Sequence, residues 1–284
     1  MEVYSGTVEV ASGAYATVRP AAGVLWLLCF VAVANGSPRI SGYIAGGTNT
    51  DVFMVSPSGL SVGGLKIYLS NTHYIRVSHN DGDTRNMVYA GYILPASVFA
   101  VPDAHVSCPA GSNATLRPAS GKVWLMTHGA VNDADVNALL KESGGQTVTI
   151  GRPVASTGAK QFEAILDYTN WWLYLNSTSG YNQITWLSAL EFTAADYPGF
   201  VVEKVTIAAE SYATVRPAVG ESWEHFWTLE PDGTGAALYD GSLSFALPTT
   251  PILARCPIHN GRYVRIYNVA GVEKFTFSMY IKLE

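Results

Sequence analysis

Short segments of alternating apolar and polar residues follow one another along the chain, separated by Gly, Asn, Asp, Ser and Pro. Because side chains alternate across a strand, this pattern predicts an antiparallel β-sandwich or jelly roll. In the first third of the chain the predicted strands are Tyr15–Arg19, Val24–Val33, Asp51–Val55, Leu65–Leu69, Tyr74–Ser78 and Met87–Leu94. Only Asp133–Glu142 has a helical spacing, through Val136, Leu139 and Leu140, and it predicts a short inserted helix.

One motif occurs three times. The segment ATVRPAAGVLW (16–26) returns as ATLRPASGKVW (114–124) and as ATVRPAVGESW (213–223), with the arginines 98 and 99 residues apart. A second match joins residues 74–77, 172–175 and 263–266, and a third joins the closing segments 89–94, 187–192 and 277–282. A repeat of this period predicts three tandem β-sandwich (jelly-roll-like) units over residues 1–96, 97–194 and 195–284.

The motif itself has a structural explanation. Proline fixes its own φ and pushes the preceding Arg to an extended conformation, and Gly supplies a turn, so the motif predicts a corner leading into the strand that carries Trp. We expect the Arg stems to lie on an apolar surface and their heads to pair with backbone carbonyls or an acid; the alternative is a ligand anchor. The motif residues are Arg19, Pro20, Gly23, Trp26, Arg117, Pro118, Gly121, Trp124, Arg216, Pro217, Gly220 and Trp223.

The two faces of the first Trp strand differ from those of its counterparts. Strand alternation places Trp26, Leu28 and Phe30 on one face, which we expect to be the sandwich core. The opposite face carries only apolar residues in the first copy but Ser222, Glu224, Phe226 and Thr228 in the third. Because an apolar outer face has to be covered, we predict an interface with another unit or another protein. Its candidate residues are Leu25, Leu27 and Val31, beside Cys29 and Val33.

The second copy alone carries a group of large rings, Trp171, Trp172, Tyr174 and Trp186. The match of Trp172 to Tyr74 and Tyr263 predicts a core residue, and alternation then points Trp171 the other way, so Trp171 is a further candidate interface residue. Exposed aromatic clusters on β-sandwiches either stack sugar rings or anchor a protein interface, and here a contact between units is favoured.

Composition narrows the function classes. The 284 residues include only 14% charged residues, against about 25% in typical domains. The formal charge of −5 has no basic excess, which argues against a protein that binds nucleic acid by neutralising phosphates. The longest apolar run, 24–34, has 11 residues and is too short to span a bilayer. The first 23 residues lack the cationic cluster of an export signal, so we expect folding inside the cell.

The sequence offers no pattern for catalysis or metal binding. The three cysteines, Cys29, Cys108 and Cys256, form no CxxC pair, and the six histidines form no HxH or HExxH pair. The run 80–83 could donate oxygens to calcium but is more typical of a hairpin turn. We therefore expect no enzyme, no cofactor and no metal.

The order ATVRPAxGxxW, a turn such as Leu238–Gly241, NxxYxRV and an alternating final strand resembles virion proteins of tailed bacteriophages, most closely jelly-roll capsid decoration (cement) proteins. The resemblance implies a structural protein on the capsid surface, made in the host cytoplasm. Its implied partners are the major capsid protein, neighbouring virion proteins and further copies of itself, with no nucleic acid and no membrane. The alternative is a tail or fibre adhesin that binds host glycan through the rings of the second copy. A glycan-active enzyme would need a carboxylate pair that no spacing proposes.

Overall fold

A computed structural model describes residues 2–33, 39–45, 48–49, 54–55, 62–79, 82–131, 136–145, 147–151, 160–169, 171–177, 180–196, 199–229, 234–246 and 256–283. Apart from one short 3-10 helix, η2 (Ala194–Asp196), the regular structure of these residues is β-strand, which confirms the predicted all-β class. Within the same residues, no helix has the length and apolar character needed to cross a membrane.

The strands fall into three consecutive groups. Unit 1 contains β1 (Glu2–Val10), β2 (Tyr15–Val18), β3 (Leu25–Val33), β4 (Arg39–Ile44), β5 (Thr48–Asn49), β6 (Met54–Val55), β7 (Val62–Leu69), β8 (His73–Ser78) and β9 (Arg85–Leu94). Unit 2 contains β10 (His105–Cys108), β11 (Asn113–Leu116), β12 (Lys122–Val131), β13 (Val136–Glu142), β14 (Thr147–Gly151), β15 (Lys160–Asp167), β16 (Trp171–Ser177) and β17 (Gln183–Thr193). Unit 3 contains β18 (Phe200–Ile207), β19 (Ser211–Val215), β20 (Ser222–Leu229), β21 (Thr234–Asp240), β22 (Leu243–Ala246), β23 (Cys256–His259), β24 (Arg262–Asn268) and β25 (Lys274–Leu283).

Each group has the same strand order. The first sheet of each runs β1-β9-β3-β7, β10-β17-β12-β15 and β18-β25-β20-β23. The second runs β2-β8-β4-β5 with β6 also paired to β4, then β11-β16-β13-β14, and finally β19, β24, β21 and β22, which the short β23–β24 contact joins to the first sheet of unit 3. Two antiparallel sheets with this crossing pattern, of four strands each except for the extra β6 in unit 1, are jelly-roll architecture. The unit boundaries at residues 96 and 194 stay a prediction.

The predicted helix over Asp133–Glu142 is wrong, because the segment from Val136 forms strand β13. Val136, Ala138 and Leu140 are fully buried, so the burial has a period of two and β13 pairs with β14 on one side and β16 on the other. Residues 133–135 lie outside the described residues. Strands β1 and β4 were absent from the predicted list, although β1 has alternating burial along its whole length.

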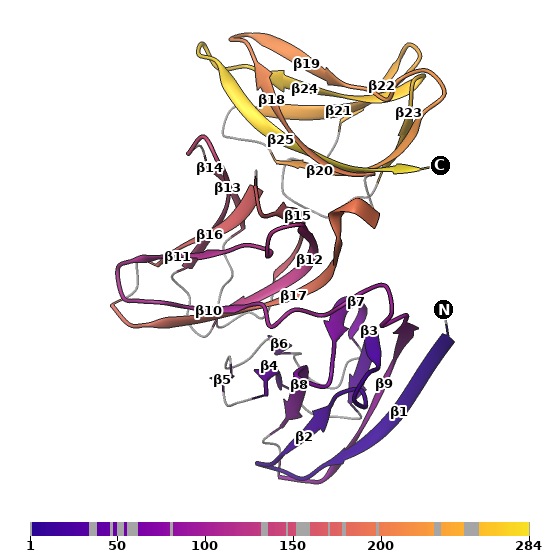
Figure 1. Cartoon of the computed structure of the whole chain (residues 1–284), viewed down its shortest axis with the longest axis vertical. Coiled ribbons are helices and arrows are strands. Elements are labelled where there is room, and N and C mark those ends of the chain that lie inside the picture. The colour runs from indigo at the N-terminus through magenta and orange to yellow at the C-terminus, as the bar shows by residue number, and fades with distance from the viewer. Residues whose placement is uncertain are drawn as a thin grey trace.

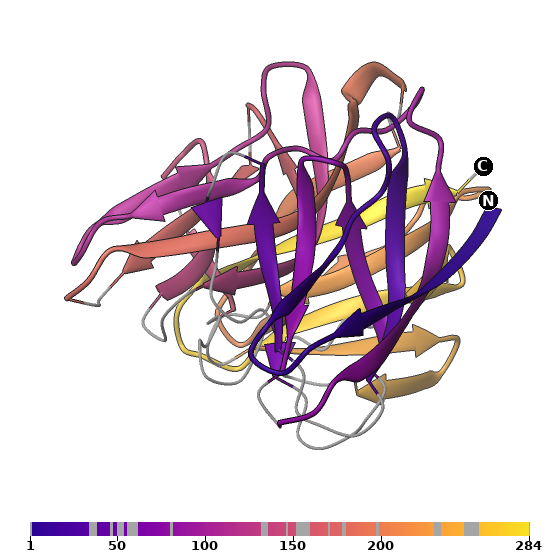
Figure 2. The ribbon, with the colours of Figure 1, turned by 90° about the horizontal axis from the view of Figure 1, so that it is seen from below.

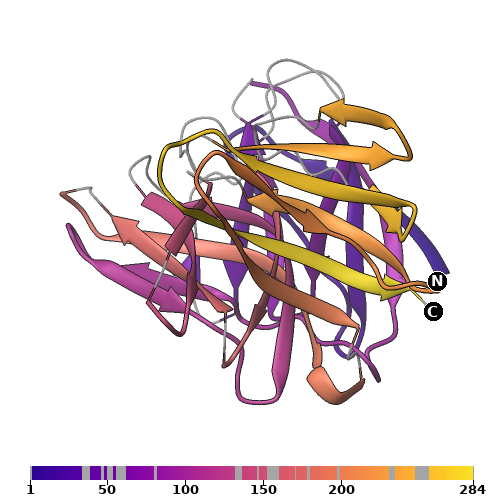
Figure 3. The same cartoon turned by 90° about the horizontal axis from the view of Figure 1, so that it is seen from above.

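The three units are stacked, with unit 1 at the bottom and unit 3 at the top of Figure 1. Strands β17 and β10 lie on the side of unit 2 that faces unit 1, and β25 and β20 lie on the side of unit 3 that faces unit 2 (Figure 1). The first strand begins and the last strand ends on the same side of the stack, as seen from below in Figure 2 and from above in Figure 3. The largest hydrophobic cluster is centred on unit 2 and also contains residues of units 1 and 3.

Candidate functional site

The junction between units 1 and 2 is anchored by Trp186, a residue of β17. Its side chain is 1% exposed and belongs to the hydrophobic cluster of unit 1, although its backbone belongs to unit 2. The indole stacks on the ring of His73 in β8, with the ring centroids 4.2 Å apart and the planes at 11°. It also lies on Gly42 in β4, where an added Cβ would come within 2.5 Å of the indole. Gly42 and His73 therefore form a socket for Trp186, and any larger residue at position 42 would displace the ring.

Hydrogen bonds fix the same junction along the edge of unit 1. The backbone N–H of Tyr68, in edge strand β7, donates to Ser188 Oγ at 2.8 Å. The Thr127 hydroxyl donates to the backbone oxygen of Lys66, two residues earlier in β7. Thr127 and Ser188 are both fully buried. Polar side chains of unit 2 thus satisfy backbone groups that an edge strand would otherwise present unpaired.

The junction between units 2 and 3 uses the same elements with different side chains. The backbone N–H of Ile165, in edge strand β15, donates to Met279 Sδ of β25 at 3.4 Å. Met279 is fully buried in the large hydrophobic cluster, and the half-buried Phe275 and Ile281 of β25 pack against that cluster. In both junctions the last strand of one unit covers the edge strand of the unit before it.

Two fully buried histidines are neutral in the folded chain. Burial lowers the pKa of His73, inside the first junction, to about 3. Burial also lowers the pKa of His225 to about 4; its Nε2 lies 2.9 Å from Ser278 Oγ within unit 3. Because the charged form of each imidazole is disfavoured in the folded chain, lowering the pH destabilises the folded state.

The predicted interface residues of unit 1 lie in two different environments. Leu25 is 7% exposed and lies in the large cluster centred on unit 2, and Leu27 packs against that cluster. The assignment of Val31 to the outer face was wrong, because Val31 lies in the core of unit 1 at 1% exposure. A β-bulge between Leu28 and Phe30 inserts one extra residue, so the alternation reverses after Leu28 and Phe30 does not share its buried face.

Part of the outer sheet face of unit 1 stays exposed. Val88 and Tyr92, on β9, are 43% and 39% exposed. Val3 is opposite Tyr92 on β1 and is 69% exposed. These three residues, named here the β1–β9 strip, occupy the same sheet face as Leu27, which pairs with Tyr92 from the other side. The strip is continuous with the covered part of the face.

The large rings of unit 2 do not gather on one surface. Trp186 is buried in unit 1, and Trp172 lies under the guanidinium of Arg117, 4.5 Å from the ring centroid. Tyr174 carries the ammonium group of Lys141 at 4.6 Å. The side chain of Trp171 lies outside what the structure describes, although its backbone belongs to β16. Of the three described rings, Trp172 and Tyr174 therefore each carry a cation and Trp186 is buried, so these three do not form one exposed platform.

The three motif arginines make the same contact. The guanidinium of Arg19 lies 5.4 Å from the Tyr74 ring centroid and that of Arg216 lies 3.6 Å from the Tyr263 ring centroid, as Arg117 does over Trp172. The head groups were expected to pair with carbonyls or acids; that contact is seen in Arg117, which donates to the backbone oxygen of Tyr168. Each arginine thus ties the motif to the second repeated segment by a cation–π contact.

The other motif residues form the predicted corner. The motif glycines Gly23, Gly121 and Gly220 have φ values of 78°, 74° and 89°, a left-handed conformation that favours glycine. The prolines Pro20 and Pro217 each accept a hydrogen bond at 3.1 Å, from Asn71 and Asn260 respectively. Trp26 stacks on Tyr4 and Trp223 on Tyr280, and the indoles of Trp124 and Trp223 donate to Glu191 and Glu221. Pro118 is buried.

A second cation–π contact extends this arrangement in units 1 and 3. Arg76 lies between the rings of Tyr15 and Tyr43, at 4.3 and 4.0 Å from their centroids. The corresponding Arg265 lies between Tyr212 and Tyr239, at 4.6 and 4.3 Å. Tyr15 and Tyr212 are more than half exposed, so these contacts cover the outer face of the second sheet of each unit.

The described residues offer little for chemistry. They contain no group of three or more His, Cys, Asp and Glu side chains that could hold a metal ion, and the three cysteines form no disulfide. A pocket of about 500 Å³ lies between the segment 96–100 and the end of β17, where Lys122 and Glu191 approach within 3.9 Å. Of the predicted turn 80–83, residues 80 and 81 lie outside the described residues, and Asp83 pairs with Arg85 at 3.0 Å.

Sequence reasoning did not identify Ser188, Thr127, Met279 or His73 as contact residues. One signal was present: β17 is apolar or small on both faces around Leu187, Ser188, Ala189 and Leu190, as in a strand buried on both sides. No pattern within one unit could show that the outer row of β17 faces the unit before it.

No family model matches the chain, and no curated protein matches it. Among solved structures, one from a study of the triple jelly roll fold and turret assembly in an archaeal virus matches over 95% of this chain and 81% of its own, with 9% identity and a TM-score of 0.26. A chain of Sulfolobus turreted icosahedral virus matches over 99% and 90%, with 10% identity and a TM-score of 0.23. A chain of the lipid-containing bacteriophage PM2 matches over 99% and 87%, with 11% identity and a TM-score of 0.20.

Proposed function

We propose that the chain is a structural component of a virus particle, a capsid decoration or minor capsid protein that binds the major capsid protein at the capsid surface. In this proposal it folds as three jelly-roll units with boundaries near residues 96 and 194, is made in the host cytoplasm, and has no catalytic activity. Its contacts are made by sheet faces and edges rather than by a pocket.

The observation that carries the proposal is the exposed β1–β9 strip. The equivalent outer rows of β17 and β25 are used to contact a neighbouring jelly roll, through Trp186 and Met279. The row on β9 has the same apolar character, yet Val88 and Tyr92 remain exposed. A surface of this kind, in a chain with only 14% charged residues, supports docking onto another protein of the shell.

Co-sedimentation with empty capsids of the virus that encodes the chain tests the proposal. We expect the wild-type chain to sediment with the capsids, and Tyr92→Asp in the β1–β9 strip to weaken that binding at least tenfold by placing a charge in an apolar contact. A matched control is Val269→Asp, at a position 77% exposed in unit 3, which should bind like the wild type.

Absence of binding to capsids at every maturation stage would overturn the proposal. Equal binding by Tyr92→Asp and the wild type would remove the β1–β9 strip as the contact. Circular dichroism of both variants separates loss of binding from loss of fold.

A further inference from the structure

The two junctions within the chain use equivalent positions. Tyr68 and Ile165 are opposite Leu27 and Leu125, the residues that follow the motif tryptophans. Their backbone N–H groups donate to Ser188 and Met279. Counted along the last strand of each unit, Ser188 and Met279 both lie three residues before the partner of the motif Trp. One docking contact is therefore repeated between unit 1 and unit 2 and between unit 2 and unit 3.

A repeated head-to-tail contact continues without limit unless its free ends differ. Here β23 of unit 3 pairs with β20 on one side and meets β24 only at His259, so among the described residues Pro257 pairs with no second strand; unit 1 has an exposed outer row on β9. If both kept the residues of the inner junctions, a second copy of the chain could stack on the first and form a fibre.

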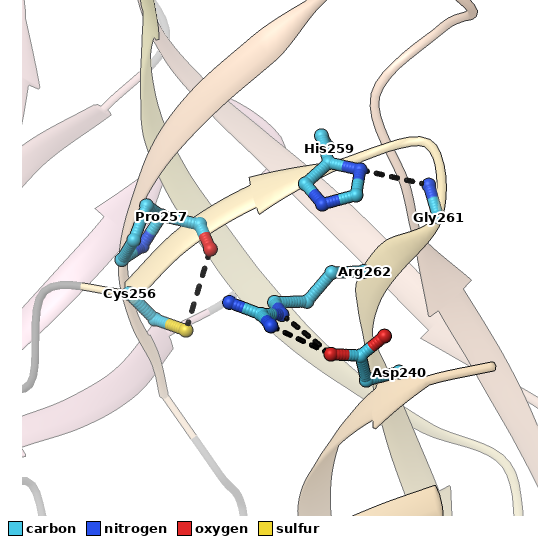
Figure 4. A network of polar contacts seen from close by, with 6 residues as sticks. All are labelled: Asp240, Cys256, Pro257, His259, Gly261 and Arg262. Atoms are coloured by element: carbon cyan, nitrogen blue, oxygen red, sulfur yellow. Dashed lines mark hydrogen bonds and ion pairs between the residues drawn. The ribbon is translucent and has the colours of Figure 1, made fainter. Parts of the chain in front are cut away.

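Strand β23, at the outer end of unit 3, lacks the backbone N–H donor found at both junctions. Its residue opposite Glu224, which follows the motif Trp223, is Pro257, where units 1 and 2 have Tyr68 and Ile165. Proline has no N–H, so this edge cannot donate the hydrogen bond found in both junctions. Figure 4 shows Pro257 on β23, with its backbone oxygen turned to the thiol of Cys256.

The Gly42 socket belongs to the first junction alone, since unit 2 also has a leucine, Leu140, at that position. Unit 3 differs by an ion pair at this end. Leu238 occupies the position of Gly42, and Arg262 and Asp240 occupy the positions of His73 and Ile44. Arg262 donates to Asp240 through Nε and Nη2, and Figure 4 shows this ion pair beside β23. The two side chains are 43% and 45% exposed, and a docked jelly roll would have to desolvate them.

The exposed outer row of β9 in unit 1 lacks the hydrogen-bond acceptor found at both junctions. Ala90 lies three residues before Ile93, the partner of Trp26, and so takes the place of Ser188 and Met279. The methyl group of Ala90 accepts no hydrogen bond. Cys29 takes the place of the bulge residue Thr127, and its thiol contacts the backbone oxygen of its own strand at Leu27.

We propose that these substitutions terminate the stack at three units. Both free ends lack groups that form the junction contact, so the chain does not associate head to tail with a second copy. The inference does not depend on the proposed function, since it concerns only the contact that joins the units. The proposal concerns only the junction contact at Ala90. The apolar residues of the β1–β9 strip remain available to a different partner.

Two single-end variants test the proposal, because they rebuild the contact of the second junction one side at a time. Pro257→Ile restores the donor edge of Ile165, and Ala90→Met restores the side chain of Met279. By sedimentation velocity we expect the wild type and each variant alone to show no head-to-tail association. An equimolar mixture should form a one-to-one dimer at least roughly tenfold more tightly than either variant associates with itself. A chain carrying both substitutions should form longer oligomers whose size rises with concentration.

Three outcomes would overturn the proposal. The first is a wild-type chain that already associates and loses that association when Ala90→Asp is introduced. The second is a mixture of the two folded variants that remains monomeric. The third is self-association of either single-end variant to the same extent as the mixture. Circular dichroism melts of each variant test whether the substitutions have left the fold intact.

Discussion

The two junctions of the stack hold equivalent strands together by different means. Between units 1 and 2 a rigid indole, Trp186, fills a socket whose floor is Gly42 and whose wall is His73. Between units 2 and 3 the anchor is Met279, an unbranched thioether that adapts to irregular gaps. The difference indicates that the first junction is specified by shape and the second by apolar contact with looser geometry.

The largest expected effect is removal of the rigid anchor. Trp186→Ala leaves a cavity in the core of unit 1 and should lower the free energy of unfolding by about 3 to 5 kcal/mol. The measurement is the shift of the first urea transition, followed by circular dichroism. Val88→Ala, at the equivalent and exposed position of unit 1, should change it by less than about 0.5 kcal/mol. A smaller loss for Trp186→Ala than for Met279→Ala would reverse the comparison.

Acid should weaken the first junction through His73. The pKa of His73 is lowered in the folded chain, so the unfolded chain binds more protons below pH 6.5 and stability falls as the pH falls. Between pH 7 and pH 5 this amounts to about 2 kcal/mol. His73→Leu should remove this part of the pH dependence and leave the part that His225 contributes, whereas His259→Gln at an exposed position should leave both unchanged. An identical pH dependence in His73→Leu would assign the acid sensitivity elsewhere, with His225 the next candidate.

A change of shape sharpens the contrast between the two anchors. Met279→Leu keeps the volume and apolar character of the second anchor and should cost less than about 1.5 kcal/mol. Trp186→Leu, the same replacement in the first anchor, should cost at least twice as much because the socket is shaped for a flat ring. Urea denaturation of both variants makes the comparison; equal losses would contradict the distinction between a rigid and an adaptable junction.

The smallest expected effect concerns the hydrogen bond of the first junction. Ser188→Ala leaves the N–H of Tyr68 without this acceptor and should cost about 1 kcal/mol. Ser107→Ala on the exposed part of β10 is the matched control and should be neutral. Ser188→Thr should retain most of the stability if the hydroxyl is what matters.

Local patterns in the sequence predicted most of the strands of unit 1. Pro and Gly of the repeated motif determine the corner, and alternation determines strands such as β8 and β9. The bulge at Cys29 could not be predicted, because a single extra residue leaves the apolar pattern of β3 unchanged while it turns Val31 into the core. The helical spacing of Val136, Leu139 and Leu140 predicts a helix for β13, but Val136, Ala138 and Leu140 in the same short segment also fit the period of a strand.

The contacts that form the two junctions could not be predicted from local sequence patterns. The sequence grouped Trp186 with Trp172 because both belong to the second copy and lie close along the chain. The two residues lie on different sheets, β17 and β16, and their side chains contact different units. Which neighbour covers an outer face depends on how the units pack, and that information is distributed over Gly42, His73 and Trp186, far apart in the sequence.

The cation–π contacts of the second sheets have a consequence for how such repeats diverge. In unit 1 the cation is Arg76 on β8 and a ring, Tyr43, lies on β4; in unit 2 the ring is Tyr174 on β16 and the cation, Lys141, lies on β13. Cation and ring have changed places between equivalent positions while the contact has persisted. Change at either position alone would pair two rings or two cations, so the two positions are expected to vary together among descendants. An alignment of the units compared one position at a time would therefore miss this shared contact, whereas pairs of positions that vary together would reveal it.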